Sequence, residues 1–261
     1  MMTGMDLEGR VALVTGGGHR LGKAITEALA EAGCQLVVHY GESGEAAEAT
    51  VTDLASRGVE AIAVGADLEV ETRIEEMFDQ VEERFGRLHI LINSAATFLK
   101  SPLGELQAED WDRVMAVNLR APFLCMRQAI PLLRAAERHD GAPAAVINVA
   151  DLSGIQPWPG YAHHGASKAG LLQLTRAAAR ELAPEIRVNA VVPGPVLPPP
   201  GVSPEVSEWQ DLVSGLPAGR CGRPAEVGSA VVFLAGNDFI LGETLCIDGG
   251  EHLIGAGRRH L

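Results

Sequence analysis

Short apolar runs alternate with longer amphipathic segments along the whole chain. Seven of these runs predict β-strands, because each is short and apolar: 11–15, 35–40, 59–65, 88–93, 144–150, 186–192 and 244–248. Six segments between them predict helices, because they are rich in Ala, Glu, Leu and Arg: 20–33, 44–57, 70–86, 108–137, 161–183 and 223–236. This alternation predicts an α/β fold with a doubly wound parallel sheet and right-handed crossovers, in a single domain over residues 1–261.

One segment departs from this alternation. Residues 193–210, PGPVLPPPGVSPEVSEWQ, carry six prolines directly after a predicted strand, so a continuous helix is not expected at their start. Long loops in compact domains are typically functional or disordered. Ligands of open α/β sheets bind at the carboxyl ends of strands. We therefore expect a loop at about 193–215 that covers a substrate, with a loop of no function as the alternative.

Composition and charge limit the classes of partner. The chain is 47% hydrophobic and 4% aromatic, which predicts a core of Ala, Val, Leu and Ile. Its formal net charge of −13 argues against nucleic acid or an anionic membrane as the main partner. There is no apolar leader and no run of about 18 apolar residues, so we expect a soluble cytoplasmic protein. The scattered cysteines predict buried thiols rather than disulfides or a zinc site: Cys34, Cys125, Cys221 and Cys246.

The first predicted turn has the composition of a nucleotide site. In VALVTGGGHRLGKA a strand runs through glycines into a helix, whose N-terminal amides favour a pyrophosphate. The generic G-x-G-x-x-G spacing is not met, because Gly22 comes one residue too late after Gly16 and Gly18. The position of the turn predicts a dinucleotide site, and a purely structural tight turn is the alternative.

Several motifs in order carry a resemblance to a known family. They are TGGGHRLG (15–22), NSAA (93–96), Asn118, the segment around Lys168, RVNAVVPGPV (187–196) and IDGG (247–250). Together they resemble the short-chain dehydrogenase/reductase family along nearly the whole chain. The resemblance implies a Rossmann fold of about seven strands, a nicotinamide dinucleotide, hydride transfer without a metal, and a homotetramer.

The resemblance also implies where the cofactor lies. Lys168 would hold the nicotinamide ribose and ease proton transfer through its charge. Asn118 would sit at a helix irregularity that anchors a proton-relay water. The other residues that the resemblance places around the cofactor are Thr15, Gly16, Gly18, His19, Arg20, Leu21, Gly22, His39, Tyr40, Ser43, Asp67, Leu68, Asn93, Ala95, Pro193 and Gly194.

Two departures from the common family pattern resemble pteridine reductases and dihydromonapterin reductases. Arg20 stands where most members have a glycine, and Asp151 stands where most have a serine. Phe98 follows the NSAA motif, where that subgroup has an aromatic residue that can stack on a flat pterin. Tyr161 and Trp209 complete the substrate site that the resemblance implies. Each residue alone also has an ordinary interpretation: Phe98 as core, Arg20 as a surface cation, and Asp151 as a turn residue.

The cofactor preference follows from the end of the second predicted strand. NAD-preferring relatives carry an acid there, which accepts bonds from the ribose 2′-hydroxyl, and here that residue is Tyr40. His19 and Ser43 could meet a 2′-phosphate instead. Glu42 stands where the pteridine reductase pattern has an arginine, and its charge would repel a phosphate. These residues favour NADP(H), with NAD(H) as the alternative.

The family's proton donor is a tyrosine four residues before the lysine, and here that residue is His164. One hypothesis makes His164 the acid, with Asp151 keeping the imidazolium populated and the Lys168 charge acting against it. A second gives the proton delivery to Tyr161 or Asp151, directly or through water. In a third hypothesis the chain binds a dinucleotide but has lost catalysis.

These observations predict an NADP-dependent reductase of a pterin or a related flat heterocycle, acting on a C=N bond. A carbonyl or hydroxyl oxidoreductase and a catalytically silent dinucleotide-binding protein are the two alternatives. No metal is expected, because the remaining histidines have no ligand-type neighbours. We expect these histidines at the surface or an interface: His89, His139, His163, His252 and His260.

Overall fold

Seven parallel strands form the centre of the fold in the computed structural model, which describes residues 5–199 and 201–254. Their order across the sheet is β3-β2-β1-β4-β5-β6-β7, and every neighbouring pair is parallel. The strands are β1 (Val11–Val14), β2 (Gln35–Tyr40), β3 (Ala61–Gly65), β4 (Ile90–Asn93), β5 (Ala144–Val149), β6 (Ile186–Pro193) and β7 (Thr244–Ile247). The predicted seven-stranded doubly wound sheet is therefore confirmed, with strand ends shifted by at most two residues.

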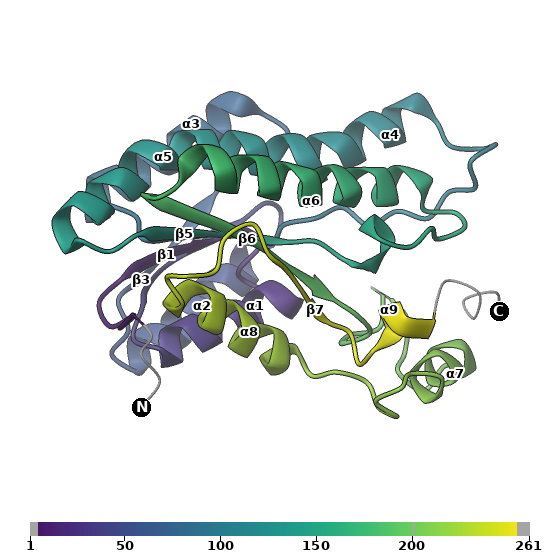
Figure 1. The fold of residues 1–261 in the computed structure, drawn as a ribbon. Helices are drawn as coiled ribbons and strands as arrows, with labels where there is room; N and C mark the ends of the chain where they lie inside the picture. The colour runs from purple at the N-terminus through teal and green to yellow at the C-terminus, as the bar shows by residue number, and fades with distance from the viewer. Residues whose placement is uncertain (1–4, 200, 255–261) are drawn as a thin grey trace.

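Helices cover both faces of this sheet (Figure 1). One face carries α3 (Glu71–Phe85), α4 (Ala108–Met115), α5 (Ala121–Asp140) and α6 (Ala162–Leu182). The other face carries α1 (Arg20–Glu31), α2 (Gly44–Ser56) and α8 (Pro224–Gly236). Each predicted helix is present, but the segment predicted as one helix over 108–137 is divided by a π-helical turn at Ala116–Arg120.

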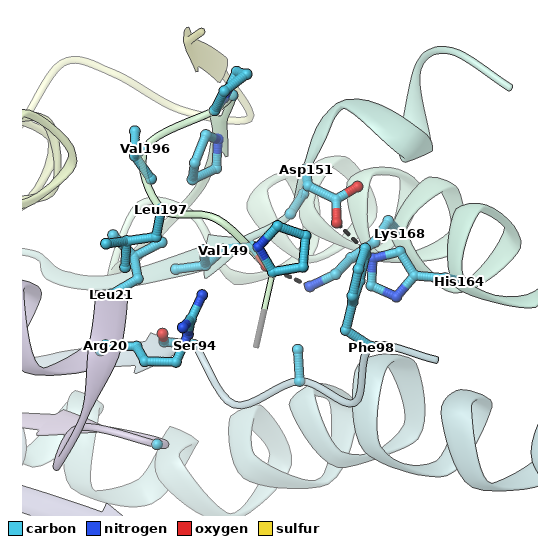
Figure 2. Close-up of a pocket in the computed structure, with 18 of the residues that line it drawn as sticks. Arg20, Leu21, Ser94, Phe98, Val149, Asp151, His164, Lys168, Val196 and Leu197 are labelled. Atoms are coloured by element: carbon cyan, nitrogen blue, oxygen red, sulfur yellow. Dashed lines mark hydrogen bonds and ion pairs between the residues drawn. The ribbon is translucent and has the colours of Figure 1, made fainter. Parts of the chain in front are cut away.

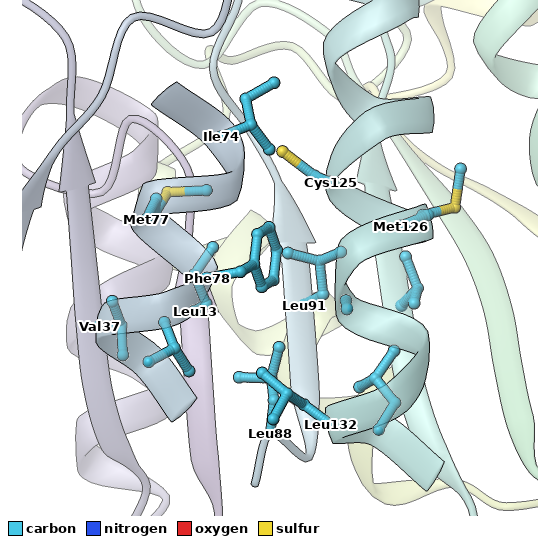
Figure 3. Packing of buried hydrophobic residues seen from close by; sticks show 14 of the residues in the cluster. Leu13, Val37, Ile74, Met77, Phe78, Leu88, Leu91, Cys125, Met126 and Leu132 are labelled. Carbon is cyan, nitrogen blue, oxygen red and sulfur yellow. The ribbon is translucent and has the colours of Figure 1, made fainter. Parts of the chain in front are cut away.

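The strands are apolar on both sides because both sides are covered. Successive residues of β1 face opposite layers: Leu13 packs in the cluster with α3 and α5, whereas Ala12 packs in the cluster with α1 and α8. Figure 3 shows the first cluster, where Phe78 of α3 lies over Leu91 of β4. These two apolar layers fix the sheet and so fix where its strand ends meet.

A buried arginine in β6 links the β7 side of the sheet to helix α8. Arg187 of β6 is 1% exposed, and its two terminal nitrogens donate to the carbonyls of Leu234 and Ala235, both at 2.7 Å. These carbonyls lie in the last turn of α8, where a cation is favoured by the helix dipole. Burial lowers the pKa of Arg187 to about 10, so the guanidinium stays charged at neutral pH.

The segment predicted as a loop over about 193–215 is partly helical. Residues Ser207–Ser214 form α7, which begins after the last proline of the segment, Pro204. Proline cannot donate the backbone hydrogen bond that a helix interior needs, so the irregular part ends where the prolines end. Figure 1 shows α7 beyond the carboxyl ends of the strands, near the short helix α9 (Glu251–Ile254).

The cysteine prediction is confirmed for two positions only. All four thiols are free, with Cys34 and Cys125 buried but Cys221 and Cys246 half-buried. Within residues 5–199 and 201–254, no helix is both long and apolar enough for a membrane crossing.

The expectation of surface positions for the remaining histidines is wrong for His89 and His163, which are 3% and 0% exposed. His89 accepts from the Val11 amide at 2.9 Å through Nδ1, and its Nε2–H donates to Asp140 at 2.9 Å. These bonds need the neutral ring, since a proton on Nδ1 would break the first one. His260 lies outside the described residues.

His89 predicts a loss of stability in mild acid. Burial lowers the pKa of His89 to about 4, and the Asp140 carboxylate only partly opposes this shift. Burial also lowers the pKa values of His39 and His163. The unfolded state therefore binds more protons between about pH 6.5 and pH 4, and stability falls as pH falls through this window. The His89 contribution is up to about 3 kcal/mol before solvent screening.

Urea unfolding at pH 7, 5.5 and 4.5 measures this loss. His89→Asn keeps an acceptor for the Val11 amide but does not titrate, so its unfolding free energy should fall less steeply with pH than that of the parent chain. Parallel pH curves for the two proteins would contradict the assignment.

Candidate active site

A cavity of about 480 Å³ opens at the carboxyl ends of the strands. Its wall is formed by the turn after β1, the segment after β4, the end of β5, the start of α6 and the segment after β6. Figure 2 shows these elements converging, with Arg20 and Leu21 on one side and Asp151, His164 and Lys168 on the other. The volume and the position are those of a small-molecule site in an open α/β sheet.

The turn after β1 leaves no room for a side chain at Gly22. Gly16 has a φ of 65°, which favours glycine, and a Cβ on Gly22 would lie 2.0 Å from the Gly16 carbonyl oxygen. Thr15 fastens the turn to the end of β4, because its Oγ1 accepts from the amides of Ser94 at 2.9 Å and Ala95 at 3.1 Å. The chain therefore passes tightly beneath the N-terminus of α1.

The N-terminus of α1 suits an anion. Within the described residues, the side chain of the N-cap residue His19 makes no capping hydrogen bond. The amides of a first helical turn have no partner inside the helix, so a phosphate or carboxylate in the cavity can accept from them. This geometry fits the pyrophosphate of a dinucleotide.

Arg20 joins this turn to the segment after β6. Its φ of 49° lies in the left-handed region, at the position where the resemblance expects a glycine. Its Nη2 donates to the Pro198 carbonyl at 2.6 Å. The guanidinium is thus placed at the cavity wall between the turn and the segment that covers it.

Asp151 and His164 form the central polar pair of the cavity. The His164 Nε2 lies 2.5 Å from Asp151 Oδ2, and the Asp151 side chain is 20% exposed whereas that of His164 is 1% exposed. Figure 2 shows the carboxylate directed at the imidazole. Asp151 also caps the short 3₁₀ turn Leu152–Gly154, because its Oδ1 accepts from the Ser153 amide at 2.8 Å. The turn-cap interpretation therefore applies to this residue, and its other carboxylate oxygen contacts His164, so its functional role stays a prediction.

The charges around this pair favour an ionised carboxylate. Burial alone would raise the pKa of Asp151, but the His164 hydrogen bond and the Lys168 charge outweigh it and lower the pKa to about 2. Lys168 is 3% exposed and donates to the Val149 carbonyl at 2.8 Å. Burial lowers the pKa of Lys168, and Asp151 acts in the opposite direction.

Asn118 lies in the π-helical turn between α4 and α5. Its amide Nδ2 lies 3.1 Å from His164 Nδ1, 3.0 Å from the Thr97 carbonyl and 3.2 Å from Ser167 Oγ. Its Oδ1 accepts from the Thr97 amide at 2.8 Å. The helix irregularity therefore exists, and it places Asn118 in direct contact with the histidine.

Aromatic rings line the cavity beside the pair. The Phe98 and Tyr161 rings stack at 4.8 Å with an interplanar angle of 25°, and Phe98 meets His164 edge-on at 4.9 Å. Trp209 of α7 and Trp158 also line the cavity. Sequence reasoning did not single out Trp158, although it stands three residues before Tyr161.

Most predicted site residues meet at this cavity. Those in its wall are Gly16, His19, Arg20, Leu21, Gly22, Ala95, Phe98, Asp151, Tyr161, His164, Lys168, Pro193, Gly194 and Trp209. Asn118 stands directly behind His164. Sequence reasoning did not predict Thr97 or Ser153. The Thr97 carbonyl lies near His164, and the Ser153 amide donates to Asp151 two residues earlier. Contacts of backbone groups leave no pattern in the sequence.

Four predicted cofactor residues, Thr15, Gly18, His39 and Asn93, contact other parts of the protein instead of the cavity. Thr15 binds strand-end backbone, and Asn93 donates to Asn148 Oδ1 at 2.8 Å. Gly18 faces α2, where a Cβ would lie 2.8 Å from the Cα of Ala47. His39 accepts from the Gly16 amide at 3.1 Å and lies 3.0 Å from the Ala66 carbonyl. These residues shape the site from behind and do not line the cavity.

The remaining four predicted cofactor residues, at the ends of β2 and β3, lie away from the cavity wall. Leu68 is buried in the core, whereas Asp67 is exposed. Tyr40 and Ser43 are half-buried at the end of β2 and the start of α2. Their contact with a cofactor stays a prediction. Over the described ranges, no cluster of three His, Cys, Asp or Glu side chains could hold a metal ion.

Comparisons with known proteins found a matching family and similar chains. Residues 18–252 match the family described as enoyl-(acyl carrier protein) reductase. The chain is 34% identical over 248 residues to the 3-oxoacyl-[acyl-carrier-protein] reductase FabG of Staphylococcus aureus, covering 93% of this chain and 98% of that one.

Two solved structures are also similar. The NADP active-site complex of Pseudomonas aeruginosa RhlG has a TM-score of 0.88 at 34% identity, covering 97% of this chain and 100% of that chain. The NADP complex of FolM alternative dihydrofolate reductase 1 from Brucella canis has a TM-score of 0.86 at 35% identity, covering 95% and 96%.

The closed turn predicts a strong effect of one added methyl group. In Gly22→Ala the new Cβ meets the Gly16 carbonyl, so the turn must open and dinucleotide affinity should fall by about 100-fold or more. Gly104→Ala is the matched control, because a Cβ there has no neighbour within 4 Å. Fluorescence titration with NADPH measures both variants, and equal affinities would contradict the placement of the pyrophosphate.

Proposed function

The chain belongs to the short-chain dehydrogenase/reductase family, and we propose that it is an NADPH-dependent reductase of a pterin or a related flat heterocycle. One observation carries this proposal: the Asp151–His164 pair lies beside the exposed Phe98 ring in the same cavity. The Asp151–His164 pair can donate and accept a proton, and the Phe98 ring can stack on a flat substrate next to the pair.

The residues present fit a nicotinamide dinucleotide. The closed turn and the N-terminus of α1 would hold the pyrophosphate, and Lys168 would hold the nicotinamide ribose. Ala95, Pro193 and Gly194 would line the rest of its path. When bound, the cofactor supplies the hydride. The preference for NADP(H) is supported by the NADP complexes among the solved relatives.

The cavity wall suits a flat substrate with polar edges. Phe98 is 39% exposed and lines the cavity, so the part of its ring that does not pack with Tyr161 and His164 can contact a flat substrate. Arg20 is placed to meet an acceptor on the substrate edge or a phosphate. The similarity to an alternative dihydrofolate reductase supports a pterin, whose ring has this shape.

Asp151 and His164 would supply the proton in place of the family tyrosine. His164 is buried behind Asp151, and Asp151 is the more exposed member of the pair. The proton held between Nε2 and Oδ2 can therefore reach a substrate nitrogen through the carboxylate. Tyr161 lines the same cavity and stays the alternative donor.

A second candidate function is the reduction of a carbonyl group. The curated relative that we compare acts, by its name, on 3-oxoacyl groups carried by acyl carrier protein. An imidazole paired with a carboxylate can protonate a carbonyl oxygen as well as a ring nitrogen. The substrate assay below separates the two candidates and the catalytically silent alternative.

The homotetramer and the cytoplasmic location also stay proposals. Trp111 of α4 and Phe123 of α5 are 38% and 44% exposed. Such apolar side chains on neighbouring helices suit a subunit interface, where we place the α4, α5 and α6 side of the molecule.

A substrate panel tests the function. We expect oxidation of NADPH with dihydrobiopterin or dihydrofolate and none with simple ketones or a 3-oxoacyl thioester.

His164→Ala should lower kcat by about 100-fold or more while NADPH affinity changes little, because the variant loses the proton and keeps the cofactor site. Full turnover in His164→Ala would refute its role, and NADPH binding without turnover of any substrate would favour the silent alternative.

Glu42 offers a separate test of the cofactor preference. It is exposed next to Ser43, where its charge opposes a 2′-phosphate. Glu42→Arg should lower the KM for NADPH and leave the KM for NADH unchanged, whereas Glu48→Arg, on the exposed surface of α2, serves as the control. No change in the NADPH constant would show that residue 42 does not face the phosphate.

A further inference from the structure

Both ring nitrogens of His164 are engaged by the protein. Nε2 lies 2.5 Å from Asp151 Oδ2. Nδ1 lies between two groups of opposite character, the Asn118 amide donor at 3.1 Å and the Thr97 carbonyl acceptor at 3.2 Å. A single imidazole nitrogen cannot bond to both at once, since it either carries a proton or accepts one.

The two contacts at Nδ1 therefore correspond to two protonation states. In the neutral ring with its proton on Nε2, Nδ1 accepts from Asn118. In the imidazolium, Nδ1–H donates to the Thr97 carbonyl, and Asn118 keeps Thr97 O at 3.0 Å and Ser167 Oγ at 3.2 Å as acceptors. No nitrogen loses its hydrogen bond in either state, so the surroundings accommodate both without movement of the backbone.

These two states differ in what they can give to a substrate. In the imidazolium the proton between Nε2 and Asp151 is transferable, because its loss leaves a neutral ring that still donates from Nδ1 to Thr97. In the neutral Nε2–H ring the same proton is held, because its loss would leave an imidazolate. The bond that Asn118 makes therefore stabilises the form that cannot act as an acid.

We propose that Asn118 and the Thr97 carbonyl together decide whether the Asp151–His164 pair can donate its proton, and that Asn118 is a positioning residue for His164 rather than only an anchor for water. This inference rests on the proposed function, in which the pair protonates a substrate nitrogen. The proton would leave Nε2 for Asp151 Oδ2 and then bond to that nitrogen, and the adjacent carbon would accept the hydride that a bound NADPH supplies. A proton from solvent returns through the partly exposed Asp151 after product leaves.

The charged and titratable groups that face His164 are few. Asp151 precedes the 3₁₀ turn, and His163, Lys168 and Tyr161 belong to α6 or its N-cap. The segment after β4 and the π-helical turn present the uncharged groups of Thr97 and Asn118 to the ring. A new charge at position 118 would therefore act on Nδ1 without a competing charge beside it.

Nitrogen-15 NMR of the full chain, labelled at histidine, reads the two states without any substrate, and His164→Gln assigns the signals. In the parent chain the neutral ring should carry its proton on Nε2, and acidification should add a proton at Nδ1. In Asn118→Asp the carboxylate should stabilise Nδ1–H and move the titration midpoint of this ring upward by about one pH unit or more. The decline of kcat/KM with rising pH should move by the same amount.

Two further variants separate this effect from general disturbance. Asn118→Ser removes the carboxamide without adding charge, so it loses the bond that stabilises the neutral ring and should move the midpoint upward by less than Asn118→Asp does. Asn189→Asp adds the same charge at another buried asparagine, bonded to the Ile240 carbonyl and the Glu243 amide, and should leave the His164 midpoint in place. An equal shift in Asn189→Asp, no shift in Asn118→Asp, or a neutral parent ring protonated at Nδ1 would each overturn the inference.

The NMR result and the substrate panel can fail separately. The expected ring states without pterin turnover would reject the pterin and keep the inference. Pterin turnover with a neutral ring protonated at Nδ1 would keep the function and reject the role of Asn118.

Discussion

The parallel pairing of β1, β4, β5 and β6 is the constraint on which the site depends. It brings the carboxyl ends of four strands to one edge of the sheet, because parallel strands all end on the same side. The segments after these strands then carry Gly16, Phe98, Asp151 and Gly194 into one cavity. Residues more than 170 positions apart in the sequence, such as Gly16 and Gly194, thereby line the same cavity.

Within this frame, His164 stands where the family resemblance expects a tyrosine, and on the proposed function it would change the chemistry that the scaffold can support. A phenol needs one partner to be held in place, whereas an imidazole has two nitrogens, and both must be satisfied when the ring is buried. Asp151 serves one nitrogen and the π-helical turn at Asn118 serves the other. The carboxylate and the histidine are therefore best understood as one unit with a shared proton.

Two parts of the cavity wall differ in construction. The turn after β1 is closed by glycines and by Thr15, and on the proposed function its backbone would meet the pyrophosphate. The opposite wall consists of proline-rich chain and α7, tied to the turn through the Arg20 bond to Pro198. On the proposed function, the first wall would hold the cofactor and the second would contact the substrate.

The sequence by itself determined the seven strands, the helical segments between them apart from the division of 108–137, and the glycine-rich turn after β1, because apolar periodicity and glycine placement are local properties. Sequence resemblance also placed Asp151, His164 and Lys168 in one site. Only the tertiary structure decided that His39 and Asn93 support the site from behind, that α7 follows the prolines, and that Thr97 and Asn118 share Nδ1 of His164. These facts depend on distances between segments far apart in the chain, and on a backbone carbonyl that every residue type carries alike.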